Sequence, residues 1–331
     1  MGCYVKRDDR SSPLYGGNKV RTLEALFGQA QREGKVWVAA TGAYGSNHAV
    51  ATVLHGARLG FRSAALLFPQ PASETARANL RVVLAQADRV VSLPHWSCLP
   101  FGMWWFAREC GQRAESALIM PPGGASPRGC LGFLSAGLEL GLQVQAGELP
   151  APREIVLALG STCSSAGLLV GLLLATRLGL GFSAERADRS RPQLIAVRVT
   201  PWPVTSPLRI LRLAGRLVAW LRQLTGDRLF DMEGAELARG LEVDTRQLGR
   251  GYGQPTASGL AAIERAGALS GALDTTYAAK SAAGLLQRVQ HRPAHDRLFW
   301  STKSSARLPE VAAAELAGAA PRMLRWLGVG A

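Results

Sequence analysis

The stretch Val36-Trp37-Val38-Ala39-Ala40-Thr41 is an almost wholly apolar run that ends where a turn rich in small residues begins. Six such residues in succession are typical of a strand that is buried in a sheet. Ser46 follows this turn and is a good N-cap, so we expect a helix to begin there. The run therefore predicts one strand–helix unit of an α/β fold.

The same alternation of strand-like and helix-like segments continues along most of the chain. Alternation of this kind predicts parallel sheets that are connected by helical crossovers. Further strands are expected at 62–68, 89–93, 117–120, 154–159, 193–199 and 297–301, helices at 73–86, 98–112, 207–224, 256–268 and 279–290, and irregular structure at 240–255.

Two domains are expected, because 331 residues exceed the size at which a single core usually stops growing. The Pro/Gly-rich run 121–129 is expected to be a loop, and a place where the chain crosses between domains. The predicted fold class is α/β, with two doubly wound lobes and mostly parallel sheets. A small α/β domain is expected over residues 23–135, and a large cofactor-binding α/β domain over residues 1–22 plus 136–331.

The composition, with 47% apolar and 19% charged residues, is that of a globular protein. The net charge of +14 comes from dispersed arginines, so we expect no nucleic-acid partner. The longest apolar run, Ala166 to Ala175, is too short to span a bilayer, and the N-terminus lacks a leader pattern. We therefore expect no membrane partner and a cytoplasmic location. The five cysteines lack ligand spacing, so no metal site is expected.

Lys19 stands in the segment Gly16-Gly17-Asn18-Lys19-Val20-Arg21 and is one of five lysines among 38 basic residues. A lysine amine, unlike a guanidinium, loses its proton when it is desolvated and can form a Schiff base. The two glycines allow the backbone to approach a flat ligand closely. The pattern suggests a lysine that carries pyridoxal phosphate, and an ordinary surface turn is the alternative.

A second candidate site lies between the strand at 154–159 and an apolar helix. Its small residues leave successive backbone N–H groups free at the positive end of a helix dipole, which favours a phosphate group. The nucleotide-binding patterns with Gly-Lys-Ser/Thr or Gly-x-Gly-x-x-Gly are absent. A helix start built of small residues for packing is the alternative. The candidate phosphate-binding residues are Gly160, Ser161, Thr162, Cys163, Ser164 and Ser165.

Ser46, Asn47 and His48 lie at another expected strand-to-helix turn. Asn47 can hydrogen-bond a ring hydroxyl, and Ser46 can carry a proton or hold a carboxylate. Ser46 can equally serve only as a helix cap. For His48 we favour a structural role, on the surface or satisfied in the core.

Three further candidates lie in the second half of the chain. Tyr252 and Tyr277 are two of only five tyrosines, and both lie at loop or helix-entry positions. They are candidate active-site phenols, with half-buried packing as the alternative. Thr302 follows the apolar strand 297–301, where α/β proteins place ligands at the carboxyl ends of strands; a plain polar turn is the alternative.

The order of these motifs over residues 4–305 resembles the D-cysteine desulfhydrase and 1-aminocyclopropane-1-carboxylate deaminase family. Members of this family are pyridoxal-phosphate enzymes of the tryptophan synthase β-like fold, also called fold type II. The motifs that carry the resemblance are Lys-Arg-Asp-Asp at 6–9, Gly-Gly-Asn-Lys-x-Arg at 16–21, Ser-Asn-His at 46–48, Pro-Pro-Gly-Gly-x-Ser-Pro at 121–127, Gly-Ser-Thr at 160–162, Gly-Tyr-Gly-x-Pro-Thr at 251–256 and Tyr-x-x-Lys at 277–280.

The resemblance implies pyridoxal 5′-phosphate as the cofactor, a small amino acid as the substrate, and a homodimer. It implies that Lys19 holds the cofactor and moves the substrate proton, and that Thr302 faces the pyridine nitrogen. The catalytic residues that it implies are Lys19, Ser46, Tyr252 and Tyr277. The cofactor-binding residues are Lys19, Asn47, Gly160, Ser161, Thr162, Cys163, Ser164, Ser165 and Thr302.

Two departures from the family pattern bear on the reaction. The deaminase branch has an acid directly after the tyrosine that matches Tyr277, whereas this chain has Ala278. The family also favours His-Thr-Gly-Gly where this chain has Ser-Thr-Lys-Ser at 301–304. Thr302 offers only a neutral hydrogen bond, which makes the ring a weaker electron sink. We therefore expect α,β-elimination that gives a keto acid and ammonia. A β-replacement enzyme, a racemase and a catalytically degraded cofactor-binding homologue are the alternatives.

Overall fold

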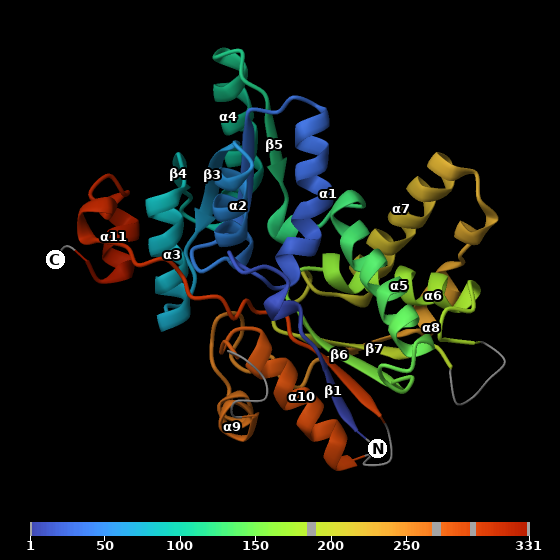
Figure 1. Ribbon diagram of the computed structural model, residues 1–331. Helices are drawn as coiled ribbons and strands as arrows, with labels where there is room; N and C mark the ends of the chain where they lie inside the picture. The colour runs from blue at the N-terminus through green and yellow to red at the C-terminus, as the bar shows by residue number, and fades with distance from the viewer. Residues whose placement is uncertain (1, 184–189, 267–272, 292–295, 330–331) are drawn as a thin grey trace. The chain divides into compact units, whose positions relative to one another are not determined.

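In the computed structural model the chain is described over residues 2–183, 190–266, 273–291 and 296–329, and it divides into two compact units (Figure 1). The first unit comprises Met1–Asp9 and Ala125–Ser304, and the second comprises Arg10–Gly124 and Ser305–Ala331. Neither unit is one continuous segment of the chain. The domain limits expected from the sequence, 23–135 against 1–22 plus 136–331, stay a prediction.

The first unit is built on a five-stranded sheet with the order β1-β9-β6-β7-β8, in which all neighbouring strands are parallel. Parallel neighbours require crossover connections, and helices supply them. The strands are β1 (Cys3–Lys6), β6 (Glu154–Leu159), β7 (Gln193–Arg198), β8 (Leu241–Asp244) and β9 (Arg297–Trp300); the helices are α5 (Leu131–Gln145), α6 (Cys163–Arg177), α7 (Pro207–Thr225), α8 (Gly234–Arg239), α9 (Ala257–Ala266) and α10 (Ala278–His291).

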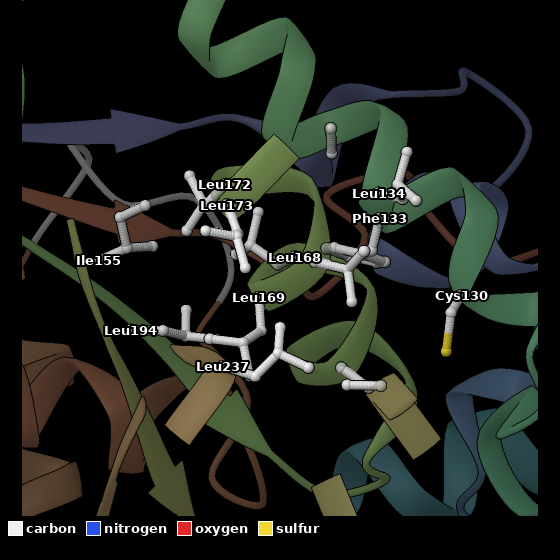
Figure 2. Close-up of a cluster of buried hydrophobic side chains, with 14 of the residues drawn as sticks. Cys130, Phe133, Leu134, Ile155, Leu168, Leu169, Leu172, Leu173, Leu194 and Leu237 are labelled. Atoms are coloured by element: carbon white, nitrogen blue, oxygen red, sulfur yellow. The ribbon is translucent and has the colours of Figure 1, made fainter. Parts of the chain in front are cut away.

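Helices cover both faces of this sheet. Successive strand side chains point to opposite faces, and here the side chains on both faces are apolar. Ile155 and Leu157 of β6 join the cluster formed with α5 and α6, whereas Val156 between them joins the cluster formed with α9 and α10. Figure 1 shows the two helical layers on opposite sides of the sheet. Figure 2 shows the larger cluster, in which Ile155 and Leu194 of the sheet lie among leucines of α6.

The α5 and α6 helices approach each other closely through small residues. A Cβ atom at Gly171 of α6 would overlap the carbonyl oxygen of Leu134 in α5, and one at Gly137 would lie 2.6 Å from the carbonyl carbon of Gly171. Because α6 begins at the candidate phosphate loop, this packing fixes the direction of the helix that carries the loop.

The second unit has a four-stranded parallel sheet with the order β4-β3-β2-β5. Val38 and Ala40 of the central strand face a cluster with α1, α2, α3 and α11, while Trp37 and Ala39 face α4. The strands are β2 (Trp37–Ala43), β3 (Arg62–Phe68), β4 (Arg89–Ser92) and β5 (Ala117–Met120); the helices are α1 (Asn18–Arg32), α2 (Asn47–Arg58), α3 (Glu74–Gln86), α4 (Leu99–Gln112) and α11 (Pro321–Leu327).

The predicted α/β class with two mostly parallel sheets is confirmed, and so is the strand–helix unit that the apolar run at 36–41 indicates. The expectation of irregular structure throughout 240–255 is wrong, because Leu241–Asp244 forms the edge strand β8. The polar run at 183–192 is typical of a solvated surface loop from its sequence, and most of it lies outside the described residues. Within the described part of the chain, every helix is too short or too polar to cross a bilayer.

Candidate active site

Lys19 is the second residue of α1 and is half-buried. Gly17 precedes the helix with φ of 92°, a backbone conformation that favours glycine. The Nζ atom of Lys19 donates a hydrogen bond of 3.4 Å to the carbonyl oxygen of Gly123. Gly17 thus serves a specific turn that delivers the lysine at the start of a helix.

Ser46 and Asn47 begin α2, directly after the carboxyl end of β2. The buried Ser46 accepts a hydrogen bond from the backbone N–H of Ala49 at 3.2 Å, so it caps the helix as expected. The side-chain oxygen of Asn47 accepts bonds from Tyr15 Oη at 3.0 Å and from Asn79 Nδ2 at 2.8 Å. These two bonds fix the carboxamide plane, so the Asn47 amide nitrogen has a defined direction as a hydrogen-bond donor.

The turn before Ser46 requires a glycine at position 45. A Cβ atom there would lie 2.5 Å from the Cβ atom of Ala76 in α3. The carbonyl oxygen of Gly45 also accepts a bond from Asn79 Nδ2 at 2.9 Å. Asn79 therefore anchors both the turn and the side chain of Asn47.

The candidate phosphate loop lies in the first unit, between the end of β6 and the start of α6. Thr162, Cys163, Ser164 and Ser165 are buried, and the Ser165 hydroxyl has no hydrogen-bond partner among the described residues. A 15-residue helix begins here, and its first backbone N–H groups have no intrahelical acceptor. A buried hydroxyl beside the positive end of a helix dipole fits the phosphate of pyridoxal 5′-phosphate.

Within this loop, Gly160 and Cys163 contact different neighbours. A Cβ atom at Gly160 would overlap Cε1 of Tyr277, so the tyrosine ring packs directly on the loop. The Cys163 sulfur lies 3.8 Å from the sulfur of Cys130, in the core against α5. The backbone of Cys163, rather than its thiol, is therefore the part of this residue suited to bind an anion.

Tyr252 and Tyr277 are brought together by the fold of the first unit. Their hydroxyl oxygens lie 2.5 Å apart, and their rings meet edge to face at 5.9 Å. Burial, partly offset by the hydrogen bond from Tyr277, raises the pKa of Tyr252 to about 12. At neutral pH Tyr252 is therefore a hydrogen-bond donor or an acid, not a base.

Lys280 holds the loop that carries Tyr252. Its buried Nζ donates to the carbonyl oxygens of Leu248 at 2.8 Å and Gly251 at 3.0 Å. Burial lowers the pKa of Lys280, while the charge of Asp274 opposes this change. The Tyr-x-x-Lys motif therefore contains Tyr277, which bonds to Tyr252, and Lys280, which positions the loop that carries Tyr252.

Thr302 lies just past β9 and is 8% exposed, as is the adjacent Lys303. Burial lowers the pKa of Lys303, and Asp274 opposes that change as well. The two carboxylate oxygens of Asp274 accept hydrogen bonds from the backbone N–H groups of Thr276, Tyr277 and Ala278. This carboxylate is therefore committed to the start of α10.

The structure thus groups the expected residues by unit. The second unit holds Lys19, Ser46 and Asn47, and the first unit holds the 160–165 loop, Tyr252, Tyr277 and Thr302. The sequence patterns did not indicate Tyr15, Asn79 or the unusual state of His48. For Asn79 a signal exists, since it is an amide at a buried position of an amphipathic helix, flanked by Leu80.

We expected His48 to lie on the surface or to be satisfied in the core, and it is neither. It is 2% exposed, and neither ring nitrogen has a hydrogen-bond partner among the described residues. Burial and, secondarily, the charge of Lys19 lower the pKa of His48 to about 3.

Comparison with known proteins relates this chain to enzymes of one cofactor class. Residues 1–298 match the family described as pyridoxal-phosphate dependent enzyme. Over 317 residues the chain is 29% identical to D-cysteine desulfhydrase of Yersinia pestis (strain Pestoides F), which spans 89% of this chain and 83% of that protein. The crystal structure of an ACC deaminase homologue superposes with a TM-score of 0.69 at 25% identity, covering 91% of this chain and 84% of that one.

A further relative is Nocardicin C-9′ epimerase of Nocardia uniformis subsp. tsuyamanensis. It is 38% identical to this chain, but over only 187 residues. That alignment spans 56% of this chain and 56% of the epimerase, so the likeness covers just over half of each protein.

Proposed function

Because the chain belongs to the family of pyridoxal-phosphate dependent enzymes, we propose that it is a lyase acting on a small amino acid. It removes the α-proton and a β-substituent, and water hydrolyses the released imine to a keto acid and ammonia. Its cofactor is pyridoxal 5′-phosphate. The likeness to D-cysteine desulfhydrase over most of both chains supports this reaction class. The substrate class proposed is therefore a cysteine-like or serine-like amino acid with a leaving group on the β-carbon.

Each candidate residue has a role in this proposal. Lys19 would hold the cofactor through its side-chain amine and would carry the α-proton of the substrate. Asn47 donates to the ring hydroxyl, and the backbone N–H groups and hydroxyls of residues 160–165 bind the phosphate. When bound, the cofactor withdraws electrons from the α-carbon of the substrate. Ser46 holds the substrate carboxylate, and Tyr252 and Tyr277 flank the substrate as protonated phenols.

The observation that carries elimination, rather than ring opening, is the engagement of Asp274. Its carboxylate accepts three backbone N–H groups, and Ala278 stands where the deaminase branch has an acid. Thr302, buried at the end of β9, is then the proposed partner of the pyridine nitrogen. A neutral hydroxyl leaves that nitrogen less protonated than an acid would, so the ring withdraws electrons less strongly. Negative charge on the substrate α-carbon is then less delocalised, which favours prompt departure of a β-substituent.

The direct test is a keto-acid and ammonia assay over D- and L-amino acids, including both enantiomers of cysteine and β-chloroalanine. We expect keto acid from at least one β-substituted substrate and little turnover of 1-aminocyclopropane-1-carboxylate. Borohydride reduction should fix the cofactor to Lys19, as located by peptide mass spectrometry. Lys19→Ala should abolish the label, whereas Lys35→Ala, in the same unit, should retain it. A label on Lys280 would overturn the assignment.

Epimerisation is the second candidate, because an epimerase is 38% identical to this chain over half of its length. The two reactions share removal of the α-proton but differ in what leaves the β-carbon. In D₂O an epimerase would place deuterium on the α-carbon and invert its chirality without releasing ammonia. Proton NMR and chiral chromatography on the same amino-acid panel distinguish the outcomes. Cofactor binding with neither reaction would instead indicate a degraded homologue.

The homodimer that the family resemblance implies and the cytoplasmic location expected from the sequence belong to the same proposal. Multi-angle light scattering of the cofactor-loaded protein tests the dimer. A mass near twice 35.2 kDa is the expected result.

A further inference from the structure

Arg198 is the last residue of β7 and lies level with the start of the candidate phosphate loop. Its register partner on the parallel strand β6 is Leu159, the residue directly before Gly160. The backbone N–H of Val199 donates to the carbonyl oxygen of Leu159 at 3.1 Å. The hydroxyl of Thr200 donates to the carbonyl oxygen of Gly160, also at 3.1 Å. The backbone of Arg198 is therefore fixed one strand away from this loop.

The side chain of Arg198 starts on the face of the sheet that α6 covers. Strand side chains alternate between faces, and Leu194 and Ala196 of β7 belong to the cluster formed with α5 and α6. Arg198 continues that alternation, and its neighbour Leu159 belongs to the same cluster. Cys163, the first residue of α6, packs there too. The arginine therefore leaves the sheet on the side where the phosphate loop turns into its helix.

The guanidinium of Arg198 lacks an acceptor within the described chain. Its Nε atom is shielded from solvent, and none of its nitrogens takes part in a hydrogen bond or an ion pair with the residues that the structure describes. Arg297, at the opposite end of the same sheet, has its counter-charge: its Nε donates to the carboxylate of Glu154 at 2.6 Å. Burying a charged donor without a partner costs free energy, so the unpaired guanidinium calls for an explanation.

The surroundings of Arg198 favour an anion beside it. Asp244 ends the neighbouring strand β8, but its register partner is Val197, so its carboxylate lies on the opposite face of the sheet. Arg246 also engages that carboxylate through hydrogen bonds of 3.0 Å and 2.6 Å. On the face of Arg198, α6 begins, and the start of a helix carries a partial positive charge. A cation near such a helix start is unfavourable unless an anion lies between them.

We propose that Arg198 binds the phosphate group of pyridoxal 5′-phosphate, alongside the backbone N–H groups of residues 160–165. This inference rests on the proposed assignment of that loop to the phosphate. A guanidinium can bind two phosphate oxygens through parallel N–H bonds, so the unpaired donors and the anion satisfy each other. The hydroxyl of Ser165, fully buried in the first turn of α6 and without a partner in the described chain, supports an anion at the same place.

The first test measures the binding of two ligands to the cofactor-free protein by fluorescence titration. Pyridoxal 5′-phosphate carries the phosphate, and pyridoxal lacks it. Arg198→Met keeps an apolar side chain but removes the charged donors, so affinity for pyridoxal 5′-phosphate should fall by about ten- to a hundredfold. Affinity for pyridoxal should stay at the parental value. Arg216→Met, at an exposed arginine of α7 in the same unit, should match the parent for both ligands.

The second test separates phosphate binding from a structural role, by thermal unfolding of the cofactor-free proteins. Arg198→Met should melt at or above the parental temperature, because it removes an unpaired buried charge. Added inorganic phosphate should raise the melting temperature of the parent more than that of the variant, with sodium chloride at equal ionic strength as the control. Arg198→Lys should retain part of the phosphate effect, because an ammonium group also binds phosphate.

Four results would overturn the inference. A lower melting temperature of cofactor-free Arg198→Met, with affinity for both ligands reduced alike, would make the arginine structural. An effect confined to the KM for the amino acid would assign it to the substrate carboxylate. Parental affinity for pyridoxal 5′-phosphate in Arg198→Met, where Gly160→Ala weakens it, would remove Arg198 but keep the loop assignment. If the parent binds pyridoxal as tightly as pyridoxal 5′-phosphate, the loop assignment fails and the role of Arg198 fails with it.

Discussion

The hydroxyl groups of Tyr252 and Tyr277 share one hydrogen bond, and burial keeps the Tyr252 phenol protonated. Only one proton can occupy the 2.5 Å space between the two oxygens, so one phenol donates inward and the other keeps a free O–H. Burial is the main cause that raises the pKa of Tyr252 to about 12. The pair can therefore supply a proton to a departing group at neutral pH without first acquiring one.

Tyr252→Phe should reveal the raised pKa of Tyr252 through the pH dependence of the free energy of unfolding. At pH 8 the variant loses one hydrogen bond, which destabilises the fold by about 1 kcal/mol. Above pH 10 the unfolded phenol ionises, whereas the folded one keeps its proton until about pH 12, so the parent loses stability as pH rises. The variant lacks that loss, and the parent–variant difference should shrink between pH 8 and 11 in urea unfolding. A constant difference would contradict the raised pKa; Tyr4→Phe is the control.

Gly160→Ala should disturb the phosphate loop through the tyrosine pair. The new Cβ would overlap the Tyr277 ring, and overpacking of this kind typically costs about 1–3 kcal/mol. We expect affinity for pyridoxal 5′-phosphate to fall by about tenfold or more, measured by fluorescence titration. Gly215→Ala in α7, where a Cβ meets nothing within 4 Å, should leave that affinity unchanged. Parental affinity in Gly160→Ala would show that the ring does not define the loop.

At the scale of single residues, the sequence suggests candidates whose chemistry is rare in the chain, such as Lys19. It could not identify Asn79, whose role depends on α3 lying beside the turn at Gly45. It also misjudged His48, because the absence of a partner is a property of packing. Residue type indicates chemistry, whereas the partner of a side chain is set only by the folded chain.

At the scale of elements, β2 and α2 could be predicted because an apolar run and an N-cap coincide. The edge strand β8 could not, since Leu-Glu-Val-Asp has only four residues and half of them are acids, which are depleted in strands. The pattern analysis also did not single out α1, although Leu23, Leu26, Phe27 and Ala30 share one buried face.

The contact between α5 and α6 yields a prediction at this scale. In Gly171→Ala the new methyl group would overlap the Leu134 carbonyl oxygen, so the helices must separate, at a cost of about 1–3 kcal/mol. Gly215→Ala, at an uncrowded helical position, should instead stabilise the fold by about 0.5–1 kcal/mol. Urea unfolding of the three proteins measures both effects. Equal stability of Gly171→Ala and the parent would mean that the helices do not touch there.

For the molecule as a whole, bound cofactor should act as a stabiliser by mass action. At a free concentration one hundred times its Kd, a ligand that binds only the folded state contributes about 2.7 kcal/mol. Removing pyridoxal 5′-phosphate should therefore lower the melting temperature, and adding it back should restore the parental value. In Lys19→Ala the gain should be smaller, because only noncovalent contacts hold the cofactor. Differential scanning calorimetry at several cofactor concentrations provides the measurement, and a melting temperature independent of cofactor would refute this.

The core of the second unit is closed by a distant part of the chain. Leu316, Met323 and Leu327 pack into the cluster formed with Val38 and Leu67. Trp326 donates to the carbonyl oxygen of Gln70 at 2.7 Å and stacks edge-on against Tyr44. During vectorial synthesis on a ribosome, the residues around β2 emerge long before these late partners exist. The nascent second unit therefore displays unsealed apolar surface until these residues have left the ribosome, and a chaperone can shield that surface in the interval.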